Sequence, residues 1–203
     1  MLNNKRNATE EFLARGLHPG SQIQIAPIDP AERFTAIKRV AIFAEAFLPK
    51  IDGVSKTAVL VARHLQQTGR EVIIFAPDHN GKTPDSLGPS QVVPVPSFEL
   101  PGVPETKVGF PSPIVNQNLD RFRPDIIHLF SPVLLSLAGL WYGRNHDLPV
   151  IANYQSDLPG YATKYGVELF SMPLRDGLRV LHNNAHLTTG PSHATIRQLK
   201  RWG

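Results

Sequence analysis

The chain has 203 residues, enough for one sizeable hydrophobic core and a small second unit. It has no cysteine, which excludes disulfides, thiolate metal sites and cysteine nucleophiles and fits a reducing compartment. The net charge of +4 comes from the region after Leu174, where five cations face one anion, so the even basic surface of a nucleic-acid scaffold is excluded.

Residues 1–38 are polar and interrupted by glycine and proline, so we expect an N-terminal extension with little regular structure. The run Arg39–Glu45 is almost continuously apolar, which predicts a strand buried on both faces. Residues Gly53–Thr68 show helical spacing of apolar side chains, and Glu71–Pro77 is a second apolar strand. Strand, helix and strand in this order predict a right-handed βαβ unit with parallel strands.

The rest of the chain continues this alternation after a proline- and glycine-rich segment, Asp78–Pro113. The predicted elements are strands at Gln91–Pro96, Pro124–Pro132 (ending at His128), Leu148–Asp157 and Ala185–Ser192, and helices at Val133–Asn145, Pro173–Asn184 and after the Ser192 cap. Residues 39–203 therefore predict an α/β fold with a Rossmann-like doubly wound parallel sheet.

Polar side chains follow the predicted strands, where ligands of such sheets bind. The first strand leads to Glu45 and to the loop that contains Asp52 and Gly53. The later strands lead to His128 with Ser131 and to the segment 154–157. We expect several of these groups to converge at one edge of the sheet.

Several well-known motifs are absent. The first loop has only Gly53, so the dinucleotide fingerprint G-x-G-x-x-G fails, and "HNGKT" (His79–Thr83) lacks the first glycine of a P-loop. His182 and His186 lack the glutamate of H-E-x-x-H, so we expect no metal site and place both on a solvated helix face. "GPSHA" is not a nucleophile elbow, and Ser192 is better explained as a helix cap.

A sugar or phosphate site remains. A single glycine at a helix N-terminus, Gly53, lets backbone N–H groups approach an anion or a hydroxyl closely. Either Tyr154 or Tyr161 is suited to be an apolar platform for a sugar ring. The carboxylates and amide suited to bridging sugar hydroxyls are Glu45, Gln155 and Asp157.

Each candidate also has a purely structural interpretation. Glu45 is also suited to cap a neighbouring helix or to pair with Lys50, and Asp52 is a good N-cap residue. His128 also fits a hydrogen-bonded core histidine.

A basic stripe falls at helical spacing in the C-terminal part, opposite leucines. It fits either contact with anionic lipid headgroups or an ordinary solvated face. Its members are Arg175, Arg179, His182 and His186.

Four segments resemble the successive signatures of family-four glycosyltransferases: "EAFLPKIDGVSKTAVLVARHLQQTGREVIIFAP", "PDIIHLFSP", "NYQSDLPGYATKYG" and "LTTGPSHATIRQLKRWG". The resemblance runs from Arg39 to the C-terminus. Within the family, it is strongest to GDP-mannose-dependent α-mannosyltransferases of bacterial glycolipid synthesis and to sulfoquinovosyl and digalactosyl lipid enzymes.

The resemblance implies the N-terminal, acceptor-binding half of a GT-B fold, in which two Rossmann-like domains face each other. It implies retaining transfer of a hexose, most simply mannose, from a nucleotide sugar such as GDP-mannose or UDP-hexose to a lipid or glycan acceptor, without an essential metal or cofactor. The implied roles are catalytic positions for Gln155 and Asp157, contact of the Gly53 loop with the donor phosphate, and cleft positions for Glu45, Asp52, His128, Tyr154 and Tyr161.

Two features depart from the family pattern. Many relatives have histidine where this chain has Gln155, and a glutamine can orient a group but cannot relay a proton. The sequence also ends at "KRWG", where relatives begin the linker to the donor domain, so we expect the chain alone to be inactive. The alternatives are a non-catalytic binding module, half of a split transferase completed by a donor-domain chain, or an inactive truncated product.

The location follows from the same observations. The N-terminus lacks the apolar region of a secretory signal, and the longest apolar stretch, Val133–Tyr142, is about half of the ~20 residues needed to cross a bilayer. We therefore expect a cytoplasmic protein, peripheral at the inner face of the membrane if it contacts anionic lipid.

Overall fold

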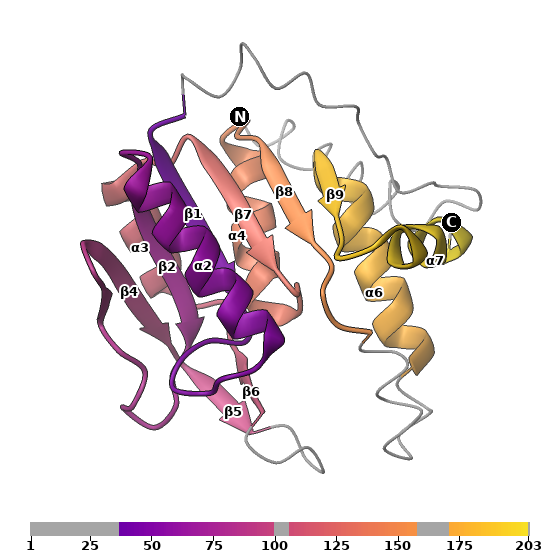
Figure 1. The fold of residues 1–203 in the computed structure, drawn as a ribbon, viewed down its shortest axis with the longest axis horizontal. Coiled ribbons are helices and arrows are strands. Elements are labelled where there is room, and N and C mark those ends of the chain that lie inside the picture. Colours follow the sequence, from indigo (N-terminus) through magenta and orange to yellow (C-terminus); the bar gives the residue numbers. More distant parts are fainter. Residues whose placement is uncertain (1–36, 100–105, 158–170, 203) are drawn as a thin grey trace.

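The computed structural model describes residues 37–99, 106–157 and 171–202 (Figure 1). A seven-stranded sheet forms its centre, in the order β3-β4-β2-β1-β7-β8-β9. All neighbours pair in parallel except β3 with β4. The strands are β1 (Arg39–Ala44), β2 (Glu71–Pro77), β3 (Ser86–Leu87), β4 (Ser90–Val95), β7 (Ile126–Phe130), β8 (Val150–Asn153) and β9 (Leu187–Thr189).

Helices lie on both faces of the sheet (Figure 1). Helix α2 packs on one face, where its Ala58 and Ala62 join the inward side chains of β1 and β2 in one apolar core. Helices α3 and α4 cover the opposite face, and a second core forms there. The helices are α2 (Gly53–Gln67), α3 (Pro113–Phe122), α4 (Leu134–Asn145), α6 (Ser171–Asn184) and α7 (His193–Trp202).

Strand β1 is apolar and buried from Val40 to Ala44 because it contributes to both cores. Ala41 and Phe43 face the α4 side, where the Phe43 ring stacks on Phe75 with 4.8 Å between ring centroids. Helix α4 approaches this pair closely at Gly139, since a Cβ atom there would lie 2.6 Å from the Phe43 ring. The glycine therefore sets the distance between helix and sheet.

The sheet has a topological switch point between β1 and β7. From β1 the chain proceeds to β2 and β4 on one side, and from β7 to β8 and β9 on the other. The loops after β1 and β7 therefore leave the same edge in opposite directions, which is where such sheets bind ligands. A short antiparallel ribbon, β5 (Ser97–Glu99) with β6 (Lys107–Gly109), lies at this carboxyl end (Figure 1).

The predicted doubly wound parallel α/β fold is confirmed. The strand predicted at Leu148–Asp157 is shorter, since β8 ends at Asn153, and helix α3 and the β5–β6 ribbon were not predicted. Most of the predicted N-terminal extension, residues 1–36, lies outside the described residues. None of the helices in the described parts of the chain has both the length and the apolar character that crossing a membrane requires.

Candidate functional site

Glu45, the first residue after β1, caps a helix that is distant in sequence. Its Oε1 accepts hydrogen bonds from the backbone N–H groups of Val133 (3.0 Å) and Ser136 (2.9 Å) at the start of α4. Val133 is the N-cap residue and has no side-chain oxygen, so Glu45 provides the acceptor that this helix lacks. Glu45 therefore caps a helix, which is one of the structural roles that the sequence allowed. It does not pair with Lys50, whose Nζ donates to Thr106 Oγ1 (3.2 Å).

The Glu45 carboxyl is almost completely buried, and burial raises its pKa to about 7. The hydrogen bonds from the α4 backbone oppose this rise but do not cancel it. Its Oε2 has no hydrogen-bond partner among the described residues. The carboxyl therefore changes its protonation near neutral pH, at the point where the β1 and β7 loops meet.

Asp52 and Gly53 form the start of α2. Asp52 Oδ1 accepts from the Ser55 backbone N–H (2.8 Å), and Ser55 Oγ accepts from the Asp52 N–H (2.8 Å), which makes a capping box. A Cβ atom on Gly53 would have no heavy atom within 4 Å, and its φ is not in the left-handed region. Nothing in the described structure therefore requires glycine at this position.

His128 does not lie at a strand end, as the sequence predicted. It is the middle residue of β7, between Ile42 of β1 and Ile151 of β8. Burial lowers its pKa to about 4, and its Nε2 has no hydrogen-bond partner among the described residues. The His128 imidazole is therefore neutral at physiological pH. Its ring centroid lies 4.2 Å from that of Phe130.

The segment after β8 is held by Tyr154. The Tyr154 hydroxyl donates to Asp157 Oδ1 (3.2 Å), and Gln198 Nε2 of α7 donates to Asp157 Oδ2 (3.3 Å). Only 2% of Tyr154 is exposed, because its ring packs with Leu178 and Leu199. Tyr154 therefore offers no free ring face to a sugar, in contrast to the expectation.

The other predicted residues of this segment differ in their accessibility. Gln155 is half-buried and Asp157 is exposed, so both can be reached from solvent. Tyr161 lies outside the described residues.

The β7 and β8 loops are joined by two serines. Ser131 has a left-handed backbone (φ 49°), donates its N–H to the Asn153 carbonyl (2.9 Å) and has its Oγ 3.0 Å from Ser156 Oγ. Together with the Glu45 cap, these contacts connect the segments that follow three neighbouring strands, β1, β7 and β8. The predicted convergence of polar loops is thus present, through contacts that sequence spacing did not specify.

The predicted basic stripe does not form one solvated face. Only 1% of His182 is exposed, its Nδ1 lies 3.1 Å from Thr188 Oγ1, and burial lowers its pKa to about 4. His186 follows the end of α6, where its Nδ1 accepts from the Val150 N–H (3.1 Å). The two histidines therefore do not share a solvated helix face, because His182 faces the core and His186 lies beyond the end of α6.

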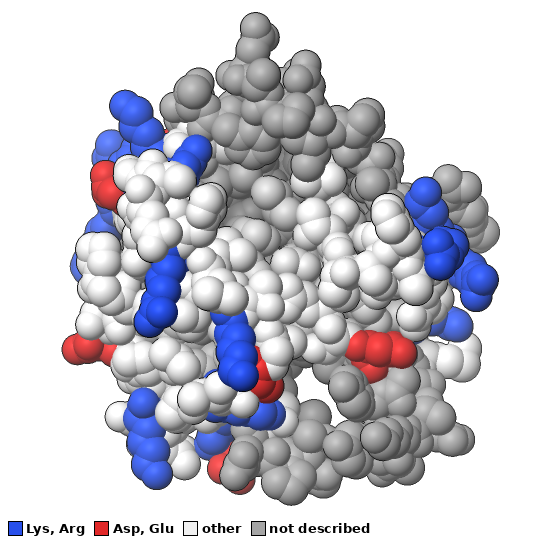
Figure 2. Space-filling model, in the orientation of Figure 1, with Lys and Arg blue, Asp and Glu red and all other residues white. Residues whose placement is uncertain are grey.

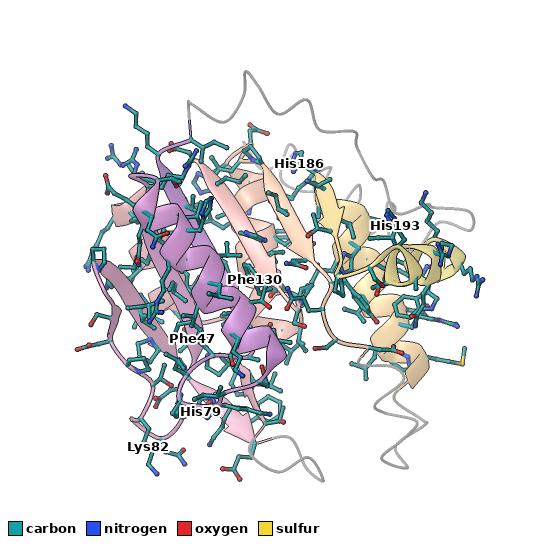
Figure 3. The ribbon with its side chains drawn as sticks, in the orientation of Figure 1. Phe47, His79, Lys82, Phe130, His186 and His193 are labelled. Carbon is teal, nitrogen blue, oxygen red and sulfur yellow. The ribbon has the colours of Figure 1, made fainter. Side chains whose placement is uncertain are left out.

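A group of basic residues that the sequence did not single out lies at the end of the sheet to which β1 and β2 point. Figure 3 shows His79 and Lys82 there, beyond Phe47. The Lys50 Nζ donates to Thr106 Oγ1 (3.2 Å) in the segment that leads into β6. The group combines three separate parts of the sequence, around positions 50, 80 and 106, and only the fold reveals that these parts are neighbours.

A family model and individual relatives both show that the chain is similar to glycosyltransferases. The sequence model of Glycosyltransferase Family 4 matches residues 51–203. A GDP-mannose-dependent alpha-mannosyltransferase of Mycobacterium tuberculosis is 39% identical over 79% of this chain and 43% of its own length. The enzyme of the same name from Mycolicibacterium smegmatis is 36% identical over 81% of this chain and 47% of its own length.

A plant protein extends this similarity. The sulfoquinovosyl transferase SQD2 of Arabidopsis thaliana is 28% identical over 88% of this chain and 35% of its own length. The chain thus spans less than half the length of these relatives. Its Rossmann-like sheet is consistent with one half of a GT-B glycosyltransferase.

Proposed function

Because the chain belongs to glycosyltransferase family 4, we propose that it is the acceptor-binding part of a retaining hexosyltransferase. The donor is a nucleotide sugar, GDP-mannose by analogy with the names of the bacterial relatives or a UDP-hexose, and the acceptor is a lipid or glycan. The chain positions an acceptor hydroxyl for attack on the sugar C1, while a second Rossmann-like part holds the nucleotide. Any contact with the membrane is peripheral and at the cytoplasmic face.

The observation that best supports this proposal is the environment of Gly53. Gly53 lies at the N-terminus of α2, where backbone N–H groups point out of the end of the helix. The N-cap Asp52 accepts the N–H of Ser55, and the first turn itself contains no acidic residue. Since a Cβ atom there would meet open space, the fold itself does not exclude a side chain. Close approach of a donor phosphate or sugar to the backbone is a reason for glycine that the chain alone does not supply.

Gln155 and Asp157 are the groups that we propose to face the reacting sugar and the acceptor. The Asp157 carboxylate is held by Tyr154 and Gln198 and is exposed, so it can accept a hydrogen bond from a sugar hydroxyl. Gln155 can donate and accept but cannot transfer a proton. In this proposal, catalysis comes from orientation and from stabilisation of the leaving phosphate rather than from a protein base.

The role of Gly53 is tested by Gly53→Ala with Gly177→Ala in α6 as a matched control. A Cβ atom at Gly177 also has no heavy atom within 4 Å, so neither change creates a clash. Both variants should keep or raise the melting temperature, since alanine is favoured over glycine in helices by up to ~1 kcal/mol. Only Gly53→Ala should lower sugar transfer, by roughly tenfold or more, because the ligand is displaced.

Transfer is measured with labelled GDP-mannose and UDP-hexoses and a glycolipid acceptor. The chain is assayed alone and mixed with the separately produced remainder of the M. tuberculosis relative. We expect transfer only in the mixture; transfer by the chain alone would refute the division of roles. Binding of short-chain lipid and glycan acceptors to the chain, followed by NMR, tests the acceptor role without turnover, and absence of binding would refute it.

A further inference from the structure

Three basic side chains from three separate segments lie together at the carboxyl end of β2. Lys50 comes from the β1–α2 loop, His79 follows β2, and Lys107 is the first residue of β6. Lys50 Nζ donates to Thr106, the neighbour of Lys107, and Lys107 Nζ donates to Asn80 Oδ1 (3.0 Å), the neighbour of His79. Figure 2 shows Lys and Arg side chains gathered at this lower left end of the molecule.

The charges of this group act on one another. The pKa of His79 is lowered, first by partial burial and then by the positive charge of Lys107, with a smaller contribution from Lys50. Asp78 acts in the opposite direction but does not compensate. The His79 imidazole is therefore neutral at pH 7 and lies within electrostatic reach of two ammonium groups.

The acidic residues nearby compensate the two lysines unequally. Only 10% of the Lys107 side chain is exposed, and its ion pair is with Glu99 (3.1 Å), whose own side chain is 69% exposed. Both carboxylate oxygens of Asp78 face the Gly81 N–H, at 3.0 and 3.1 Å. Lys50 makes no ion pair with any acidic residue of the described segments. Lys50 therefore has a hydroxyl but no carboxylate as its partner in the described segments, and a bound anion would supply the missing negative charge.

We propose that Lys50, His79 and Lys107 form a subsite for an acidic group of the acceptor: a phosphate, sulfonate or carboxylate. The proposal rests on the transferase function above and narrows the acceptor to an anionic molecule. Lys50 lies three residues before Gly53, so an acceptor held here reaches the same loop as the donor. Ile51, between them, is 69% exposed and offers apolar contact to an amphiphile beside the charged group.

The test compares two soluble lipids with the same tails, the anionic dihexanoylphosphatidate and the neutral dihexanoylglycerol, in NMR titrations of the chain. We expect the anionic lipid to bind, to shift the ring signals of His79 and to raise its pKa, while the neutral lipid leaves them unchanged. Lys50→Met should weaken binding about fivefold, as expected for removal of one partly exposed charge. Lys200→Met, on the exposed side of α7, should not weaken it.

Two further titrations, with inorganic phosphate and with GDP, identify the source of the anion. Phosphate should bind at the same residues but more weakly than the lipid. Equal binding of the two lipids, insensitivity to Lys50→Met in a folded variant, or preference of the site for GDP would each overturn the acceptor assignment. His79→Gln provides a second variant and should weaken binding less than Lys50→Met, because it removes no charge at pH 7.

The same variants separate this proposal from the proposed function. If the mixture with the donor part transfers sugar to an anionic acceptor but is indifferent to Lys50→Met, the subsite is refuted and the transferase stands. If the chain binds the anionic lipid through Lys50 but no combination transfers sugar, the transferase is refuted; the anion site then stands, but its assignment to an acceptor does not.

Discussion

The buried carboxyl of Glu45 should make the free energy of unfolding depend on pH. Its pKa in the folded protein is about 7, whereas the ordinary glutamate pKa of 4.5 represents the unfolded chain. Between these values the native state keeps a proton that the unfolded chain releases, so the unfolding free energy falls as pH rises. The Glu45 contribution is complete below pH 4.5 and is lost above pH 7. At about 1.4 kcal/mol per pH unit, the loss amounts to ~3 kcal/mol.

The variant Glu45→Gln should not show this loss. Glutamine has one oxygen that can accept both hydrogen bonds from Val133 and Ser136, and it cannot ionise. We expect similar stability of the two proteins near pH 4.5 and an advantage of ~3 kcal/mol for the variant at pH 8. For a chain of this length, that is a difference of about 6 to 12 °C in melting temperature.

The assay is urea unfolding of both proteins at several pH values from 4.5 to 8. Only the difference between the proteins is interpreted, because His128 and His182 have lowered pKa values of about 4 and make an opposite contribution to both. A difference that stays constant across this range would show that native Glu45 ionises normally, and would refute the reasoning. Glu45→Ala should be less stable than Glu45→Gln at every pH, by ~1 kcal/mol or more, because α4 loses its cap.

Two further changes test the packing. The wild type should lose ~3 kcal/mol of stability as pH falls from 6.5 toward 4, because the buried His182 must then take up a proton. His182→Gln should remove this loss, and parallel pH profiles of the two proteins in urea unfolding would contradict the prediction. Gly139→Ala should lower the free energy of unfolding by ~1–3 kcal/mol, since the added Cβ would lie 2.6 Å from the Phe43 ring. Adding Phe43→Leu should recover part of this stability. A melting temperature equal to that of the wild type would show that α4 can shift freely.

The sequence predicted the elements whose signal is local. Strand β1 was found because it is buried on both faces, which produces a continuous apolar run that needs no knowledge of its partners. Helix α3 carried a signal too, with Pro113 at its first turn and Val115 and Leu119 at helical spacing. It was overlooked because it directly follows a segment dominated by proline and glycine.

The contacts of the site could not be predicted in the same way. Glu45 caps a helix that begins about 90 residues later, and no local pattern encodes that partner. His182 was assigned to a solvated face from its spacing, yet Tyr154 and Thr188, which surround its ring, come from other segments. Sequence thus indicated which strand ends carry polar groups, while the tertiary fold decided which of these groups meet.

The two outermost strands of the sheet are very short. In the described part of the chain, β3 has two residues and β9 has three. The Gln66 side chain also donates to the Leu87 carbonyl of β3 (2.8 Å) and to Ser90 Oγ (2.6 Å), so part of that edge is already paired. A strand from another molecule would find few free backbone groups to extend the sheet, and this disfavours edge-to-edge aggregation of the concentrated protein.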